Sequence, residues 1–83
     1  MTITRKFLEA RLATTNTNLR KCGMLEPDEI LTITPSNHDR LPWRLEREIS
    51  TGKGRHIVRS VTDNVSWQQL CAAVDALYEI SWR

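Results

Sequence analysis

The clearest helical pattern of apolar and polar positions lies at the end of the chain, over residues 66–80. Apolar side chains recur there every three or four residues, which is the spacing of an amphipathic helix. The predicted stripe consists of Leu70, Ala73, Val74, Leu77 and Ile80, with Trp67, Cys71 and Tyr78 at its edge and Gln68, Asp75 and Glu79 opposite. The pattern predicts a helix over about 66–81 that covers a flat apolar surface.

Capping signals place the start of this helix. Ser66 and Gln69 have the spacing of a capping box, in which each side chain accepts a hydrogen bond from the other residue's backbone amide. Val65 and Leu70 have the spacing of a hydrophobic staple across the same turn. The helix is therefore expected to begin directly after Ser66.

A second helical pattern opens the chain, over about residues 4–22. Leu8, Leu12 and Leu19 share one stripe, Thr4 is the expected N-cap, and Gly23 is the expected C′ residue, with Met24 placed for an apolar contact. The run 14–18 contains only threonine and asparagine, residues that compete with the helical backbone for hydrogen bonds. It predicts a break or a frayed turn within the helix.

Three strands are predicted between the helices, over about 29–34, 41–49 and 55–61. The second alternates best: Leu41, Trp43, Leu45 and Ile49 face one way with Arg47 as the polar exception, and Arg44, Glu46 and Glu48 face the other way, toward water. In the third strand, Ile57 and Val61 are the expected inward residues, and His56, Val58 and Ser60 form the alternative register. Short loops between strands indicate an antiparallel meander.

These elements predict an α+β fold with the order α-β-β-β-α, in which two helices pack on one face of a three-stranded antiparallel sheet. The 83 residues fit a single domain, 1–83. No apolar run approaches the length of a membrane span, so we expect no membrane partner and a cytoplasmic location. Cys22 and Cys71 are expected as reduced thiols, with Cys71 in the core.

No residue pattern indicates an enzyme. His38 and Asp39 are adjacent in a turn and His56 lies on a strand, without a nucleophile or an orienting group in a recognisable arrangement. We predict no catalytic residues, no metal site and no cofactor. Ordinary turn and strand-surface positions are the expected roles of both histidines.

Charge distribution gives the candidate binding residues. The net charge is only +2, but residues 1–24 carry five basic side chains against one glutamate, and residues 41–59 carry five against two glutamates. Gly52–Arg55 is a basic glycine hairpin that can hold a phosphate or can simply be solvated. Trp82, near the end of the chain, either packs against the first helix or marks a partner surface. The candidate binding surface is Arg5, Lys6, Arg11, Arg44, Lys53, Arg55 and Trp82.

The element order, with the alanine-rich run 71–77, resembles the double-stranded RNA-binding domain. That family holds phosphates with lysines at the start of its last helix. This chain has Ser66, Trp67, Gln68 and Gln69 at those positions, and only Pro35 and His38 where the family has Gly-Pro and histidine. The resemblance therefore implies a topology rather than an RNA contact.

The opening run 3–11, followed by Asn16, the strand 43–47 and the closing helix, resembles small uncharacterised proteins of phages and prophages. The resemblance implies an accessory protein acting in the host cell cytoplasm by binding a host or phage component. Our first hypothesis is thus a small non-enzymatic module that acts by protein–protein contact, for example as an inhibitor of a host complex. The alternatives are nucleic-acid binding through the first helix and the Gly52–Arg55 hairpin, and self-association through a sheet edge or Trp82; the sequence leaves the oligomeric state open.

Overall fold

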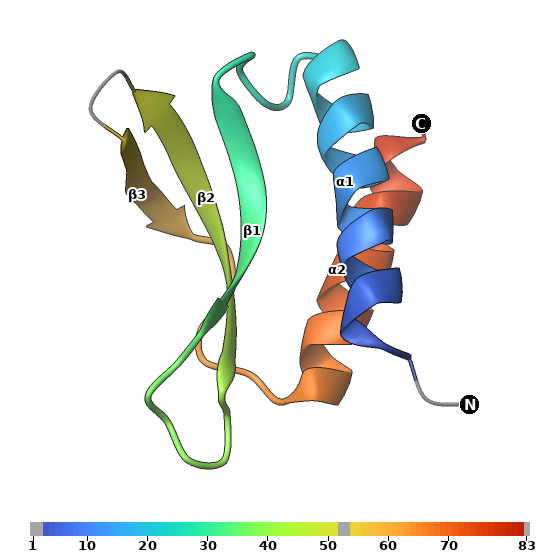
Figure 1. Ribbon diagram of the computed structural model, residues 1–83. Coiled ribbons are helices and arrows are strands. Elements are labelled where there is room, and N and C mark those ends of the chain that lie inside the picture. Colours follow the sequence, from blue (N-terminus) through green and yellow to red (C-terminus); the bar gives the residue numbers. More distant parts are fainter. Residues whose placement is uncertain (1–2, 52–53, 83) are drawn as a thin grey trace.

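Two helices cover one face of a three-stranded antiparallel sheet, which confirms the predicted fold class (Figure 1). The computed structural model describes residues 3–51 and 54–82. In chain order, the elements are α1 (Arg5–Lys21), β1 (Glu29–Pro35), β2 (Trp43–Thr51), β3 (Gly54–Ser60) and α2 (Trp67–Ser81). The strands lie in the order β1-β2-β3, so β1 and β3 form the two edges of the sheet.

Helix α1 is continuous, and the predicted break at residues 14–18 was wrong. The threonine hydroxyls in this run donate to carbonyls four residues back, Thr14 to Ala10, Thr15 to Arg11 and Thr17 to Ala13. The helical hydrogen bonds are kept, because each hydroxyl only shares a carbonyl that the helix already uses. The two asparagines point away from the helix and bond to other elements, as described below.

The helix caps follow the sequence signals. Thr4 Oγ1 accepts from the Phe7 amide at 3.2 Å, and the reciprocal Ser66–Gln69 capping box is present at the start of α2. At the end of α1, the Met24 amide donates to Leu19 O and Gly23, at φ +83°, donates to Arg20 O, which is a Schellman motif. We had predicted an apolar contact for Met24, but Met24 is exposed, and the next residue, Leu25, is buried in its place.

The two helices run parallel to each other (Figure 1). Three hydrogen bonds join them along their length. Trp67 Nε1 donates to Ile3 O at 3.1 Å, Arg11 Nη1 pairs with Asp75 Oδ1, and Asn18 Nδ2 donates to Ser81 Oγ at 3.3 Å. The paired residues are 64, 64 and 63 positions apart in the chain, so the helices keep one register from end to end.

This pairing rotates α2 relative to the predicted stripe. Cys71 is buried with Leu70 and Val74, whereas Ile80 is 43% exposed. Asp75, whose side chain is 43% exposed, lies close enough to α1 to pair with Arg11 in this orientation. The core contains Leu8, Leu12, Leu19, Leu25, Leu31, Leu45, Leu70, Cys71 and Val74.

The sheet register explains which β2 residues meet this core. Leu31 of β1 pairs with Arg47, and Ile33 pairs with the fully buried Leu45, so the odd-numbered residues of both strands face the helices, which confirms the side predicted for β2. The even-numbered residues of β2 lie on the outer face. Glu46 belongs to that face but is only 2% exposed, so the prediction that it meets water was wrong. Neighbouring side chains cover it, and Arg44 Nη1 lies 3.7 Å from its Oε2.

No helix in the described ranges is long and apolar enough to cross a membrane. Both cysteines are free thiols, Cys22 exposed and Cys71 buried, in agreement with the prediction.

The Cys71 thiol gives a prediction about pH. Burial raises the pKa of this thiol above its ordinary value of 9.0, and the nearby Asp75 carboxylate raises it further. In the unfolded chain the thiol ionises at its ordinary value, so folding is favoured below that pH and loses stability as the pH rises above it. We expect wild type to lose stability relative to Cys71→Ala between about pH 8 and pH 10 in urea titrations. A constant difference across this range would contradict the prediction.

Candidate functional site

A strip of aromatic and cationic side chains lies on the exposed side of the helix pair. The Arg11 guanidinium is sandwiched between the rings of Phe7 and Tyr78, 4.9 and 4.7 Å from their centroids. Trp82 packs edge-on against Tyr78 at 5.8 Å and is 61% exposed. Because Arg11 also pairs with Asp75, its charge is used to join the helices. Trp82 packs on α2 instead of on the first helix.

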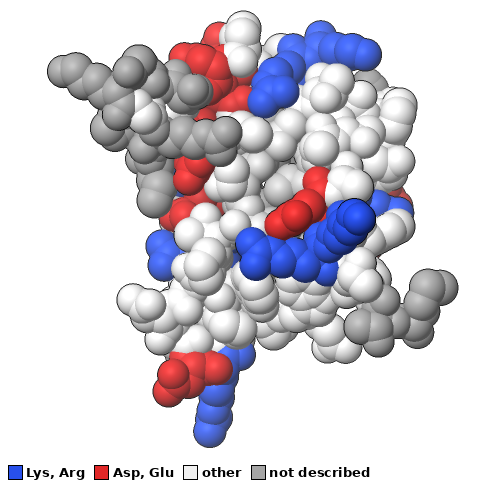
Figure 2. Space-filling view, in the orientation of Figure 1, with Lys and Arg blue, Asp and Glu red and all other residues white. Residues whose placement is uncertain are grey.

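The other basic residues of α1 do not form a continuous basic face. Arg5 pairs with Glu9 at 2.9 Å and lies over the Trp43 ring, 5.3 Å from its centroid, while Lys6 is exposed. Figure 2 shows blue and red atoms in small adjacent groups separated by white surface on the face it presents. The candidate residues Arg5 and Arg11 are therefore each compensated by a carboxylate on the same surface.

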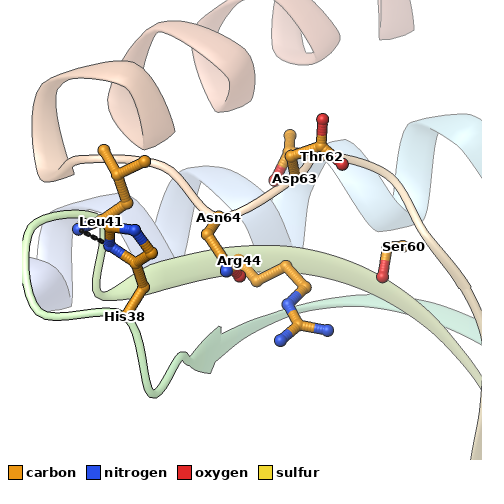
Figure 3. A pocket seen from close by; sticks show the side chains of 7 residues that line it. All are labelled: His38, Leu41, Arg44, Ser60, Thr62, Asp63 and Asn64. Carbon is orange, nitrogen blue, oxygen red and sulfur yellow. Dashed lines mark hydrogen bonds between the residues drawn. The ribbon is translucent and has the colours of Figure 1, made fainter.

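Arg44 borders a hollow of about 440 Å³ between the β1–β2 loop and the segment that follows β3 (Figure 3). His38 Nδ1 accepts from the backbone amides of Arg40 and Leu41, which fixes the loop on one side. The acidic Asp63 lines the other side, and Arg44 is directed toward the buried Glu46. Opposite charges within the hollow thus already balance, and we assign it no ligand.

Side chains of α1 close the β1 edge of the sheet. The Asn16 carboxamide donates from Nδ2 to Leu31 O at 3.1 Å and accepts at Oδ1 from Leu31 N at 2.8 Å, so it bonds to the edge as a neighbouring strand would. The Arg20 guanidinium donates twice to Glu29 O, and Pro35, which has no amide hydrogen, ends the strand. The backbone groups of Leu31 and the carbonyl of Glu29 are therefore not available to a further strand.

The opposite edge, β3, is open. In the described part of the chain β3 pairs with β2 and contacts neither helix, and in Figure 1 it lies on the side of the sheet away from them. Arg59 pairs with Arg47, and the Val61 amide donates to Leu45 O, so both residues direct their backbone groups toward β2. Strand alternation then directs the backbone groups of Ser60 away from the sheet. Lys53 and the side chains of Arg55 and Ile57 lie outside the described residues, so the predictions made for them stay predictions.

Beside this edge lies a pair of arginines that the candidate list did not include. Arg47 and Arg59 are cross-strand neighbours, next to a register shift between Arg47 and Glu48. With Ser60 and Val61 they line a hollow of about 300 Å³. The sequence contained one signal for this site, because Arg47 is the polar exception in the apolar series Leu41, Trp43, Leu45 and Ile49. Its partner Arg59 depends on the register of β3, which the sequence left open.

Within residues 3–51 and 54–82, no group of three or more His, Cys, Asp or Glu side chains is arranged to hold a metal ion. No protein-family model, curated protein or solved structure matches the chain. The resemblances to phage proteins and to the double-stranded RNA-binding domain therefore stay predictions from the sequence.

Proposed function

We propose that the protein is a protein-binding module that adds an extended, acidic segment of its partner to the open edge of β3. The supporting observation is that one edge of the sheet is covered by α1 and the other edge is not. Asn16 and Arg20 bond to the backbone of β1, whereas β3 has no element beside it in the described part of the chain. An exposed edge offers unpaired amides and carbonyls, to which an extended segment can bond as an additional strand.

The charge of the hairpin favours an acidic segment. Between residues 47 and 59 the chain carries Arg47, Lys53, Arg55 and Arg59 against the single acidic residue Glu48. Basic residues at an edge discourage pairing with neutral or basic strands and favour a segment of opposite charge.

The test begins with peptides selected from a displayed library of random ten-residue segments, chosen for binding to the wild-type protein. We expect acidic peptides whose binding slows hydrogen exchange of the Ser60 amide, because that amide becomes bonded to the added strand. Ser60→Pro removes this donor and is expected to weaken binding about tenfold, the equivalent of one hydrogen bond. Proline is tolerated at a strand edge, so the fold should persist.

Gln68→Pro is the matched control. Gln68 is exposed in the first turn of α2, where proline is accommodated, and lies away from β3. Peptide affinity should be unchanged in this variant. Peptides that bind without protecting the Ser60 amide would contradict the proposal. So would tighter binding of nucleic acid that weakens steeply with salt, which is the signature of the alternative function.

A further inference from the structure

The Arg47–Arg59 pair has an unbalanced charge on the side of the sheet that faces the helices. Like charges directly opposite each other on adjacent strands destabilise a sheet. Glu29 compensates one of them, because its Oε2 lies 2.9 Å from Arg47 Nε and its side chain is only 8% exposed. The Arg47 Nε–H does not point at that oxygen, so the contact is an ion pair without a directed hydrogen bond.

Arg59 has no such compensation. It is exposed, and no carboxylate pairs with it within the described ranges. Glu29 on β1 lies diagonally across from Arg47 on β2, and Arg59 on β3 lies directly opposite Arg47, so the next position beside Arg59 belongs to a strand added at the open edge. The register shift beside Arg47 places Arg59 opposite it, because a bulge re-aims the residues that follow it.

We infer that the hollow lined by Arg47 and Arg59 receives a carboxylate of the partner segment, supplied by the residue opposite Arg59. This inference rests on the function proposed above and specifies the sequence that the edge selects. A guanidinium binds a carboxylate through two parallel N–H groups, and no carboxylate among the described residues uses those of Arg59. The segment is thus expected to carry aspartate or glutamate at one defined position.

Val61 allows a second position of the partner segment to be predicted. It lies two residues after Arg59, lines the same hollow and is 43% exposed. Side chains two residues apart on a strand share a face, so the partner residue opposite Val61 is two positions away from the acidic one. An apolar side chain there would cover Val61. The selected pattern is therefore an acidic residue and an apolar residue separated by one position.

The inference is tested by repeating the peptide selection on Arg59→Glu and Arg40→Glu, two exposed arginines with the same change of charge. Wild type and Arg40→Glu should enrich the same acidic–x–apolar pattern in either direction. Arg59→Glu should replace the acidic residue by lysine or arginine and bind the wild-type peptide about tenfold more weakly or worse, as expected for loss of a charge-assisted pair. Arg59→Gln should show the weaker binding without the reversed preference.

Two failures can be told apart. If peptides are selected and protect the Ser60 amide but show no charge preference at this position, the carboxylate site is overturned and strand addition stands. If no peptide is enriched, or if the selected peptides leave the Ser60 amide unprotected, strand addition is overturned and the carboxylate site with it. Circular dichroism of each variant checks that the fold is intact before selection.

Discussion

Asn16→Ala is expected to lower the free energy of unfolding by about 3 kcal/mol, with no effect of that size from Asn18→Ala on the same helix. Asn16 is 4% exposed, and its carboxamide bonds to both the amide and the carbonyl of Leu31. Alanine leaves both backbone groups buried without partners. Each unsatisfied group costs about 1–3 kcal/mol, and the better helix propensity of alanine returns only a few tenths.

Asn18 is the matched control because it changes the same residue type half a turn away. It makes one 3.3 Å bond to Ser81 and is only partly buried, so water can replace that partner. The loss of one such bond and the gain in helix propensity should nearly cancel, leaving a change of about 0.5 kcal/mol or less. Urea unfolding of both variants measures the difference. Equal effects would show that the contact to Leu31 does not hold α1 against β1.

The Asn16 contact also shows where sequence reasoning stopped. Thr4, Ser66 and Gly23 act through local hydrogen bonds, so their spacing alone predicts the caps and the limits of the helices. Asn16 acts on a residue 15 positions away in the chain. From the local sequence alone, an asparagine in a helix is expected to compete for the backbone hydrogen bonds of that helix. Asn16 bonds to the edge of the sheet instead, and this depends on the position of β1 beside α1.

The candidate surface was predicted only in part for a similar reason. The sequence identifies which residues are basic but not which of them are already paired. Arg11 proved to be a contact between the helices, and Arg5 is paired within α1. Arg59 stands out only once the β2–β3 register sets it opposite Arg47, and a bulge of one residue shifts that register. In short strands joined by a glycine turn, the sequence does not specify whether such a shift in register occurs.

Glu29→Ala is expected to lower the free energy of unfolding by about 2 kcal/mol. The carboxylate of Glu29 accepts from the Glu26 amide at 2.9 Å through Oε1 and pairs with Arg47 through Oε2. Removing one partner of a buried ion pair costs about 3–5 kcal/mol. The smaller value follows because the Arg47 side chain is 33% exposed and regains contact with water.

Glu29→Ala also leaves the repulsion between Arg47 and Arg59 uncompensated. Adding Arg59→Gln removes that repulsion and so measures its size. Arg59→Gln should restore about 0.5–1 kcal/mol in the Glu29→Ala background and change stability little in wild type, where Glu29 compensates Arg47 and so weakens its repulsion with Arg59. Added salt should reduce the restoring effect, because it screens charges on the exposed side of the strand. If Arg59→Gln had the same effect in both backgrounds, Glu29 would not be compensating Arg47. The charge on Arg59 would then not be the uncompensated one on which selection of an acidic segment depends.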